Sequence, residues 1–333
     1  MRIAVDGMGG DYAPQEIVTG AIQGAREYGC HVVLVGDQTL LQSELDKHKN
    51  VPNTVTIHHA GSFVRMDESA AAAIRKKKDA SIAVCADLAK DKVVDAIVTA
   101  GHTGAAVVAC TLKLRLLEGV ERPGIGILFP TLGTPTLLMD VGANIDTKPI
   151  QLFQYAVMGD VYFRYILRKS QPSIGILNIG EEDSKGTEYI KEAHRLLDQS
   201  RLHFVGNVEG RDIFNGKVDI VVCDGFVGNV VLKVSESIAD VIGKLLKQEL
   251  KKTPLTMLGA FLAKPAFDAL RKEVDYSEYG GAPLLGINGN CIISHGSSNA
   301  RAIKNAIRVS CEFVKYEINQ HIIESMRSLN TKE

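Results

Sequence analysis

The sequence predicts an α/β protein whose central sheet is mainly parallel and carries helices on both faces, a three-layer sandwich. Short β-branched or apolar runs alternate along the chain with longer segments of helical periodicity, which is typical of such a sheet. Runs such as DIVVCD (219–224) are apolar at every position between their end residues. Strands that are buried on both faces have this composition, whereas a half-exposed strand alternates.

The individual elements follow from these two patterns. Strands are predicted at 3–6, 31–36, 55–58, 96–99, 124–129, 136–140, 173–178, 203–207 and 218–223. Helices are predicted between them at 15–28, 69–78, 103–117, 150–168 and 187–199. A last helix is expected from 298 to about 327, where Ser297 or Ser298 can cap its first turn.

A projecting helical hairpin is predicted at about 234–270. From 234 to 251, apolar residues recur every three or four positions opposite a lysine-rich face, as in an amphipathic helix. Pro254 cannot continue that helix, and Thr253 can cap the next one. The segment LTMLGAFLAKPAF (255–267) is more apolar than one buried stripe requires. We interpret residues 1–333 as a single α/β domain that includes this hairpin.

Composition limits the classes of function. The chain has 38 basic and 39 acidic residues, so its net charge of −1 provides no overall field that attracts nucleic acid. Its six cysteines are far apart and form no C-x-x-C, which favours reduced structural thiols and a cytoplasmic protein over zinc or disulfides. No apolar run approaches the ~20 residues of a membrane-spanning helix. We expect no metal.

Seven segments combine Gly with polar residues, and each follows or flanks an apolar run. They are DGMGGDYAP (6–14), TAGHTGA (99–105), DVGAN (140–144), NIGEEDSKG (178–186), VEGRD (208–212), DGFVGN (224–229) and HGSSN (295–299). Open α/β sheets bind their ligands in loops at the carboxyl ends of parallel strands. We therefore expect one cleft built from many of these loops.

The TAGHTGA segment is a candidate oxyanion site. Gly101 and Gly104 open a turn before a helix, and His102 and Thr103 place donors beside the helix N-terminus. An equally weighted alternative is a tight strand–helix turn in which Thr103 only caps the helix. Neither the G-x-G-x-x-G dinucleotide fingerprint nor a G-x-x-x-x-G-K-[ST] loop is present.

Charged residues in the other loops have a functional and a structural interpretation. Lys185 can pair with phosphate as a point charge, and Arg211 can grip a planar oxyanion with two hydrogen bonds. The alternative is a solvated loop in which each pairs with neighbouring acids. For DGMGGDYAP we favour a structural role for Asp11 and leave Asp6 open. The chain lacks a G-x-S-x-G elbow and a cysteine in a basic turn, so a covalent acyl-enzyme is not indicated.

Taken together, the ordered motifs resemble those of the bacterial phosphate acyltransferase family of phospholipid synthesis. They are DGMGGDYAP, AG-x-TGA, LLMDVGAN, LNIGEEDSKG, FVGNVEGRD, VVCDGFVGNVVLK, YGGAPLLGINGN and SHGSSNARAI, and they run from Met1 to about Arg308. The resemblance implies an isocitrate/isopropylmalate dehydrogenase-like fold, also related to phosphate acetyltransferase. His102 departs from it, because many members have Asn there.

The resemblance also implies an activity and partners. Inorganic phosphate attacks the thioester of acyl–acyl carrier protein (acyl-ACP), which gives acyl phosphate and free carrier. A membrane-bound glycerol 3-phosphate acyltransferase then uses the acyl phosphate. Members work as homodimers close to the cytoplasmic membrane, and no nicotinamide or other cofactor is expected.

The candidate residues fit this chemistry. The TAGHTGA turn, Lys185 and Arg211 are candidates for binding phosphate. Donors must also face the thioester oxygen as it gains negative charge. The candidates for this role are Asn144, Asn229, His295 and Ser297, and His102 is a further candidate for catalysis. Positioning the two reactants can supply roughly 7–11 kcal/mol in the best oriented systems.

The hairpin tip has two interpretations under the same resemblance. Its apolar residues are Leu255, Met257, Leu258, Phe261 and Leu262. Partial insertion of these side chains, aided by nearby lysines, predicts reversible binding to an anionic membrane surface. The alternative is a dimer interface that buries the same residues, and both interpretations can hold together.

Three other functions compete with this one. An NAD- and metal-dependent decarboxylating dehydrogenase shares the fold, but Asp6, Asp140 and Asp224 are scattered and no arginine group is apparent. A short-chain phosphotransacylase that uses acyl-CoA is the second, and a comparison of acyl donors separates it from an ACP-dependent enzyme. A non-catalytic acyl-ACP-binding scaffold at the membrane is the third, and it would release no acyl phosphate.

Overall fold

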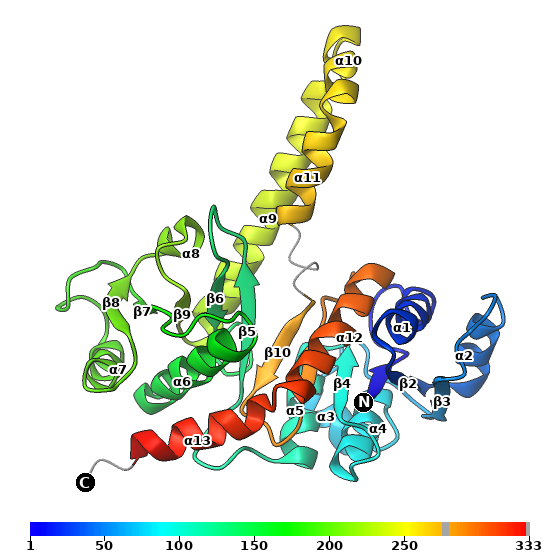
Figure 1. The fold of residues 1–333 in the computed structure, drawn as a ribbon, viewed down its shortest axis with the longest axis horizontal. Helices are drawn as coiled ribbons and strands as arrows, with labels where there is room; N and C mark the ends of the chain where they lie inside the picture. The colour runs from blue at the N-terminus through cyan, green and yellow to red at the C-terminus, as the bar shows by residue number, and fades with distance from the viewer. Residues whose placement is uncertain (275–279, 331–333) are drawn as a thin grey trace.

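A computed structural model describes residues 1–274 and 280–330 of the chain. Within this part, eleven strands form one sheet with helices on both faces, and a long pair of helices projects away from it (Figure 1). Seven of the ten strand pairings are parallel, so the predicted mainly parallel α/β sheet is confirmed.

The elements have the following bounds. The strands are β1 (Arg2–Asp6), β2 (His31–Gly36), β3 (Val55–His59), β4 (Ala96–Thr99), β5 (Gly124–Phe129), β6 (Thr136–Met139), β7 (Ile174–Leu177), β8 (Phe204–Val208), β9 (Ile220–Val222), β10 (Ala282–Leu285) and β11 (Cys291–Ile293). The helices of the sandwich are α1 (Gln15–Tyr28), α2 (Gln38–Leu45), α3 (Ala70–Lys76), α4 (Ser81–Lys90), α5 (Thr103–Leu114), α6 (Pro149–Tyr165), α7 (Glu188–Asp198), α8 (Asp212–Asn215), α12 (Ala300–Lys315) and α13 (Ile318–Asn330). The projecting helices are α9 (Gly225–Leu250), α10 (Pro254–Leu262) and α11 (Lys264–Val274).

The sheet consists of two parallel blocks that run in opposite directions. Its strand order is β3-β2-β1-β4-β11-β10-β5-β6-β9-β7-β8. The first five strands are mutually parallel, and so are the last four. Three successive antiparallel pairings, β11–β10, β10–β5 and β5–β6, join the two blocks and reverse the direction. The carboxyl ends of the blocks therefore emerge at opposite edges of the sheet.

The core lies on both faces of this sheet. Ile3 and Val5 of β1 join one hydrophobic cluster with α1, α6 and α12, while Ala4 between them joins a second cluster with α4 and α5. Because successive strand residues point to opposite faces, this division is that of a sheet between two helical layers. The predicted three-layer sandwich is confirmed.

All nine predicted strands are present, and their ends agree within two residues. Strands β10 and β11 and helices α2, α4 and α8 were not predicted. The predicted last helix is two helices, α12 and α13. Helix α9 begins at Gly225, nine residues before the predicted start, because the Asp224 carboxylate accepts the Val227 N–H (2.8 Å) and caps it.

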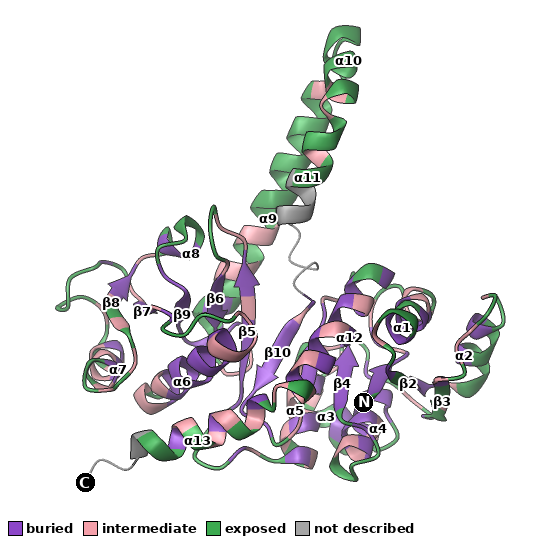
Figure 2. Ribbon diagram, viewed as in Figure 1, coloured by how far each residue is buried: buried purple, intermediate pink, exposed green. Residues whose placement is uncertain are grey.

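The hairpin α9–α11 projects out of the sandwich. Helix α9 has 26 residues and is therefore about 39 Å long. Its outer part and α10 are exposed along their length (Figure 2). At the tip, Leu255 is 78% exposed and Phe261 is 71% exposed. Among the described residues, no helix has the length and apolar character needed to cross a membrane.

Candidate functional site

Three of the glycine-rich loops meet at the carboxyl ends of β1, β4 and β11. Residue Ile293 of β11 pairs with Thr99 of β4, and Val5 of β1 pairs with Val98 of β4. The loops 6–14, 99–105 and 295–299 therefore leave the sheet side by side, and the Asp11 N–H donates to the Gly296 carbonyl (2.8 Å). We call these three loops the first loop group.

Glycine is required where these loops touch. A Cβ at Gly9 would lie 2.7 Å from the Gly101 nitrogen. Gly10 has a φ of +111°, and its Cβ would lie 3.1 Å from the Gly296 carbonyl oxygen. Residues with a side chain rarely adopt that φ, and the loop backbones would have to separate to admit a Cβ atom at either position.

The Asp6 carboxylate links two loops of the first loop group. Its buried carboxylate accepts hydrogen bonds from the Thr99 hydroxyl (2.8 Å) and the Met8 N–H (3.3 Å). Burial raises the pKa of this carboxyl, and the hydrogen bonds to Ser81, Thr99 and the backbone lower it in part. Asp6, left open from the sequence, has a structural role in this loop group.

His102 caps helix α5. Its Nδ1 accepts the Ala105 N–H (3.3 Å), and its Nε2 lies 3.1 Å from the Glu68 carbonyl oxygen. The neutral imidazole with its proton on Nε2 fits both contacts, because a backbone N–H can only donate. The cap of α5 is thus His102, and not Thr103 as the alternative interpretation of this turn had it. Thr103 is exposed at the start of the helix, and Gly104 faces the His102 ring.

His295 and Ser297 form a pair on the loop after β11. The His295 Nδ1 lies 2.7 Å from the Ser297 Oγ and accepts the Ser297 N–H at 3.2 Å. Ser294, one residue earlier, has a buried hydroxyl for which the described part of the chain supplies no hydrogen-bond partner. Buried polar atoms are rarely left unpaired, so Ser294 Oγ is a candidate contact for a bound molecule.

The other four glycine-rich loops meet at the opposite edge of the sheet, and we call them the second loop group. They follow β6, β7, β8 and β9 and comprise 140–144, 178–186, 208–212 and 224–229. The buried Asp140 organises the first of them by accepting hydrogen bonds from four backbone N–H groups. Burial raises the pKa of Asp140, opposed by these hydrogen bonds.

Asn144 and Asn229 belong to the second loop group. The Asn144 amide donates to the Pro123 carbonyl and to the Tyr155 hydroxyl (2.8 Å), which ties it into the protein interior. Asn229 is exposed on the first turn of α9 and lies over Gly142.

Lys185 and Arg211 also lie in the second loop group, and both are exposed. Arg211 forms ion pairs with Glu181 (2.8 Å) and Glu209 (3.2 Å), and these acids raise its pKa. This arrangement is the one that the structural interpretation of Arg211 predicts. The Lys185 carbonyl accepts from the Asn178 amide (3.1 Å), which fixes the backbone of its loop.

The expectation of one cleft from seven loops is wrong for a single chain. His102, His295, Ser297, Gly101, Thr103 and Gly104 belong to the first loop group, and Asn144, Asn229, Lys185 and Arg211 belong to the second. Five strand spacings separate β11 from β7, roughly 24 Å. The reversal by β10 and β5 puts the two groups on opposite edges, and β10 was not predicted from the sequence.

Sequence reasoning missed two polar side chains of the first loop group. Ser294 lies just before the HGSSN motif and reads as the end of an apolar run. Glu236 belongs to the polar face of α9, and its Oε1 lies 3.9 Å from the His295 Nε2. Only the pairing of β11 with β4 reveals that the loop after β11, with His295, lies beside the loop after β4. Across the described residues, no group of three or more His, Cys, Asp or Glu side chains is arranged to hold a metal.

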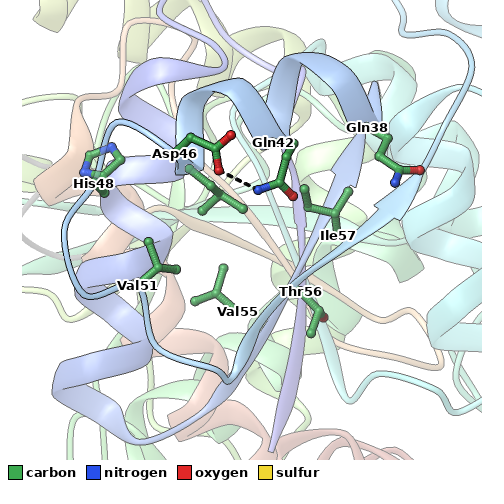
Figure 3. A pocket seen from close by; sticks show the side chains of 9 residues that line it. Gln38, Gln42, Asp46, His48, Val51, Val55, Thr56 and Ile57 are labelled. Carbon is green, nitrogen blue, oxygen red and sulfur yellow. Dashed lines mark hydrogen bonds between the residues drawn. The ribbon is translucent and has the colours of Figure 1, made fainter.

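A hollow of about 670 Å³ lies elsewhere, between α2 and the edge strand β3 (Figure 3). It is lined by Gln38, Gln42, Leu45, Asp46, His48, Val51, Val55, Thr56 and Ile57. The Gln42 amide donates to Asp46 across its rim (2.8 Å). No residue that the sequence singled out lines it, so the chemistry argues for the first loop group instead.

Comparison with known proteins gives one family. The family model described as "Fatty acid synthesis protein" matches residues 1–321. The chain is 50% identical over 328 residues to a phosphate acyltransferase from Geobacter sulfurreducens, which covers 98% of this chain and 95% of that protein. It is 49% identical over 327 residues to a phosphate acyltransferase from Geotalea daltonii, and this alignment covers 98% of this chain and 94% of that protein.

Solved structures show the same fold at low sequence identity. A phosphotransacetylase from Streptococcus pyogenes has a TM-score of 0.61 and 16% identity, and covers 98% of this chain and 94% of that one. A 4-hydroxythreonine-4-phosphate dehydrogenase from Klebsiella pneumoniae has a TM-score of 0.51 and 14% identity, and covers 94% and 99%. The predicted dehydrogenase-like sandwich, related to phosphotransacetylases, is confirmed.

Proposed function

The chain belongs to the fatty acid synthesis protein family of phosphate acyltransferases, and from this premise we propose that its acyl donor is an acyl carrier protein. As an acyltransferase of this family, it transfers an acyl group to phosphate. The proposal adds the carrier-bound fatty acyl thioester as donor. It also places the acyl phosphate upstream of glycerol 3-phosphate acylation in phospholipid synthesis. The eight ordered motifs and the full-length similarity support it.

The proposed reaction needs a nucleophile, an oxyanion site and one proton transfer. A hydrogen phosphate oxygen attacks the thioester carbon, the C–O bond forms, and the carbonyl oxygen gains negative charge. The C–S bond then breaks. The proton of hydrogen phosphate ends on the carrier sulfur, so the products are acyl phosphate and the free thiol. No covalent acyl-enzyme and no cofactor enters this balance.

The first loop group is the best-supported place for this chemistry, and the His295–Ser297 pair carries the assignment. Its hydroxyl and imidazole are 2.7 Å apart where three loops converge beside the start of α5. Backbone N–H groups at the start of α5, at Thr103 and Gly104, present positive dipole to an anion, which suits phosphate, whereas the Gly101 N–H donates to the Thr99 hydroxyl (3.1 Å). The buried Ser294 hydroxyl, next to His295 in the chain, has no hydrogen-bond partner among the described residues.

Ser297 and His295 can manage the proton. Ser297 Oγ takes the phosphate proton while its own proton moves to the His295 Nδ1, and the imidazolium then returns a proton to the leaving sulfur. Such acid–base assistance contributes about 10²–10⁴-fold. Asn144, Asn229, Lys185 and Arg211 remain predictions. Lys185 and Arg211 follow β7 and β8, five or more strand spacings from β11, so they reach this site only if another copy of the chain brings them there. Asn229 lies on α9, seven residues before Glu236.

Enzyme assays with Ser297→Ala and His295→Ala test the assignment. Each should lower kcat for acyl phosphate formation about 100-fold and leave the Tm unchanged. Ser237→Ala is the matched control. Ser237 is an exposed serine on α9, and its hydroxyl donates a hydrogen bond to the Lys233 carbonyl of the same helix. Wild-type kcat in both site variants would contradict the assignment. Running each assay with acyl-ACP and with short-chain acyl-CoA separates the two donor classes.

The hairpin is suited to delivering an apolar product, the fatty acyl phosphate, to a membrane. We propose that α9 pairs with α9 of a second copy and that the α10 tip touches the cytoplasmic face of the membrane. The exposed apolar stripe of α9, which includes Ile238, Ile242 and Leu245, supports the first part. The exposed Leu255, Met257, Leu258, Phe261 and Leu262 support the second. Acyl phosphate would then pass to the membrane-bound glycerol 3-phosphate acyltransferase.

A further inference from the structure

Glu236 on α9 has a carboxylate oxygen with no evident structural purpose. Its Oε2 pairs with the Lys233 ammonium (2.8 Å), a contact within one turn of the same helix. Its Oε1 is buried, and among the side chains that the structure describes none donates a hydrogen bond to it. A buried acceptor left in this way destabilises the folded state, because it has lost its hydrogen bonds to water and gained none in return. Such an atom calls for an explanation in the function of the site.

The His295 imidazole, on the loop after β11, lies close to Oε1. The His295 Nε2 lies 3.9 Å from Oε1, too far for a hydrogen bond but within electrostatic contact. The Nδ1 of the same ring accepts the Ser297 backbone N–H (3.2 Å), and a backbone N–H can only donate. In the neutral ring the proton is therefore on Nε2 and faces Glu236.

Glu236, His295 and Ser297 thus form a line of three groups from two distant parts of the chain. The carboxylate lies at one end, the hydroxyl lies at the other, and the imidazole connects them with Nδ1 toward the hydroxyl. A carboxylate on the far side of a histidine stabilises the ring when it becomes charged and fixes its orientation, as in hydrolase triads. Here the hydroxyl relays a proton and forms no acyl bond.

We propose that Glu236 is a positioning residue for the acyl transfer, acting through His295. The inference rests on the proposed function of the first loop group. Its negative charge favours the imidazolium that forms while the proton passes from phosphate to the carrier sulfur. The 3.9 Å contact tightens to a hydrogen bond in the loaded enzyme, as often occurs when catalytic contacts are long in an empty site.

This role links the projecting hairpin to the chemistry. Glu236 lies twelve residues beyond the Asp224 cap, roughly 18 Å along α9, and before the exposed outer part of the helix. A movement of α9 relative to the sheet would therefore change the distance from Oε1 to Nε2 without altering the proposed phosphate site at the start of α5.

Steady-state kinetics of Glu236→Gln and Glu236→Ala test the inference. Both should lower kcat about 10- to 100-fold, while KM for inorganic phosphate stays within about twofold of wild type. Gln keeps the shape and an acceptor oxygen but lacks the charge, so a purely structural role predicts that Glu236→Gln retains full kcat. Glu249→Ala is the control and should match wild type, because Glu249 is an exposed glutamate of the same helix that pairs with Lys252 just beyond the helix end.

The outcomes separate this inference from the proposed function. If Ser297→Ala loses activity and Glu236→Gln does not, the role of Glu236 is overturned and the site stands. If Ser297→Ala and His295→Ala both keep wild-type kcat, the site itself is wrong. Equal Tm values for the Gln and wild-type proteins show that any loss of kcat does not come from unfolding.

Discussion

His102 shows how one side chain reads differently in sequence and in structure. From the sequence it was a candidate for catalysis beside a helix N-terminus. In the structure both of its ring nitrogens are engaged, one by the Ala105 N–H and one by the Glu68 carbonyl. Its role is therefore to cap α5 and to hold the loop before α3.

A pair of His102 variants tests the cap. His102→Ala should lower the Tm by about 2 °C, since loss of an N-cap destabilises by about 1 kcal/mol. His102→Asn should leave the Tm unchanged, because Asn caps helices well. It should also keep kcat within twofold of wild type. Thermal melting followed by circular dichroism and the acyl phosphate assay give both numbers. A 100-fold loss of kcat in the Asn variant would instead assign proton transfer to the imidazole.

Lys185 and Arg211 carry the sequence-based prediction of a phosphate contact. Lys185→Ala or Arg211→Ala should raise KM for phosphate about tenfold, the effect of losing one hydrogen bond to a charged group. Arg195→Ala is the control, because the exposed Arg195 side chain forms a surface ion pair with Glu192. An unchanged KM in both variants refutes the prediction and leaves Arg211 as the surface ion pair described above.

A positive result would carry a further consequence for these two cations. The second loop group lies roughly 24 Å from the first within one chain, so the contact would have to come from another copy. At phosphate well below KM, co-expression of Lys185→Ala with Ser297→Ala chains should then give about a quarter of wild-type activity, because half the dimers are mixed and each has one intact site. No restoration means that the cations act elsewhere.

At the scale of elements, α9 joins the second loop group through glycine. A Cβ at Gly228 would lie within van der Waals overlap of the Asp140 carbonyl oxygen, so only Gly lets the first turns of α9 dock there. Gly243, farther along the same helix, has no atom within 4 Å of the position of its Cβ. The same residue type thus has two roles in one helix.

The two glycines give opposite predictions for stability. Gly228→Ala should reduce the free energy of unfolding by about 3 kcal/mol, because backbone must move to admit the methyl group. Gly243→Ala should increase it by up to about 1 kcal/mol, as expected for Ala in a helix interior. Urea unfolding of both variants measures the difference. Equal stabilities would contradict the docking of α9 described here.

The hairpin divides its exposed apolar residues between a stripe and a tip. Leu258→Glu should abolish sedimentation with anionic liposomes and keep the dimer, because Leu258 lies on α10. Ile242→Glu should break the dimer, because it places a charge in the α9 stripe. Light scattering after gel filtration reports the mass. If Leu258→Glu yields monomers, the tip is the interface and the membrane interpretation fails.

Prediction from sequence succeeded where periodicity is strong and failed where elements are short. β10 contains Pro283 and has four residues, and β11 has three, so each offers only a short apolar run between glycine-rich and polar loop residues. Proline in a strand also argues against a sheet assignment, since it cannot donate to the ladder. Missing these strands hid the reversal of direction.

That reversal decides the layout of the whole molecule. With all strands parallel, seven glycine-rich loops would line one edge, as expected from the sequence. With β10 and β5 reversing the direction, three loops lie on one edge and four on the other. The motifs identify the seven loops in the sequence. Which of these loops lie together depends on how the strands pair. Glu236 could not be found from the sequence, because 59 residues separate it from His295.

The account depends on orthophosphate attacking a carrier-bound thioester directly in the first loop group. Incubation of the protein with acyl-ACP and phosphate labelled in all four oxygens with ¹⁸O, followed by mass spectrometry of product and protein, tests it. We predict acyl phosphate that retains all four labelled oxygens, free carrier thiol, an unmodified protein mass, and loss of product with Ser297→Ala. An acyl adduct on the protein, or product only when acyl-CoA replaces acyl-ACP, would contradict it.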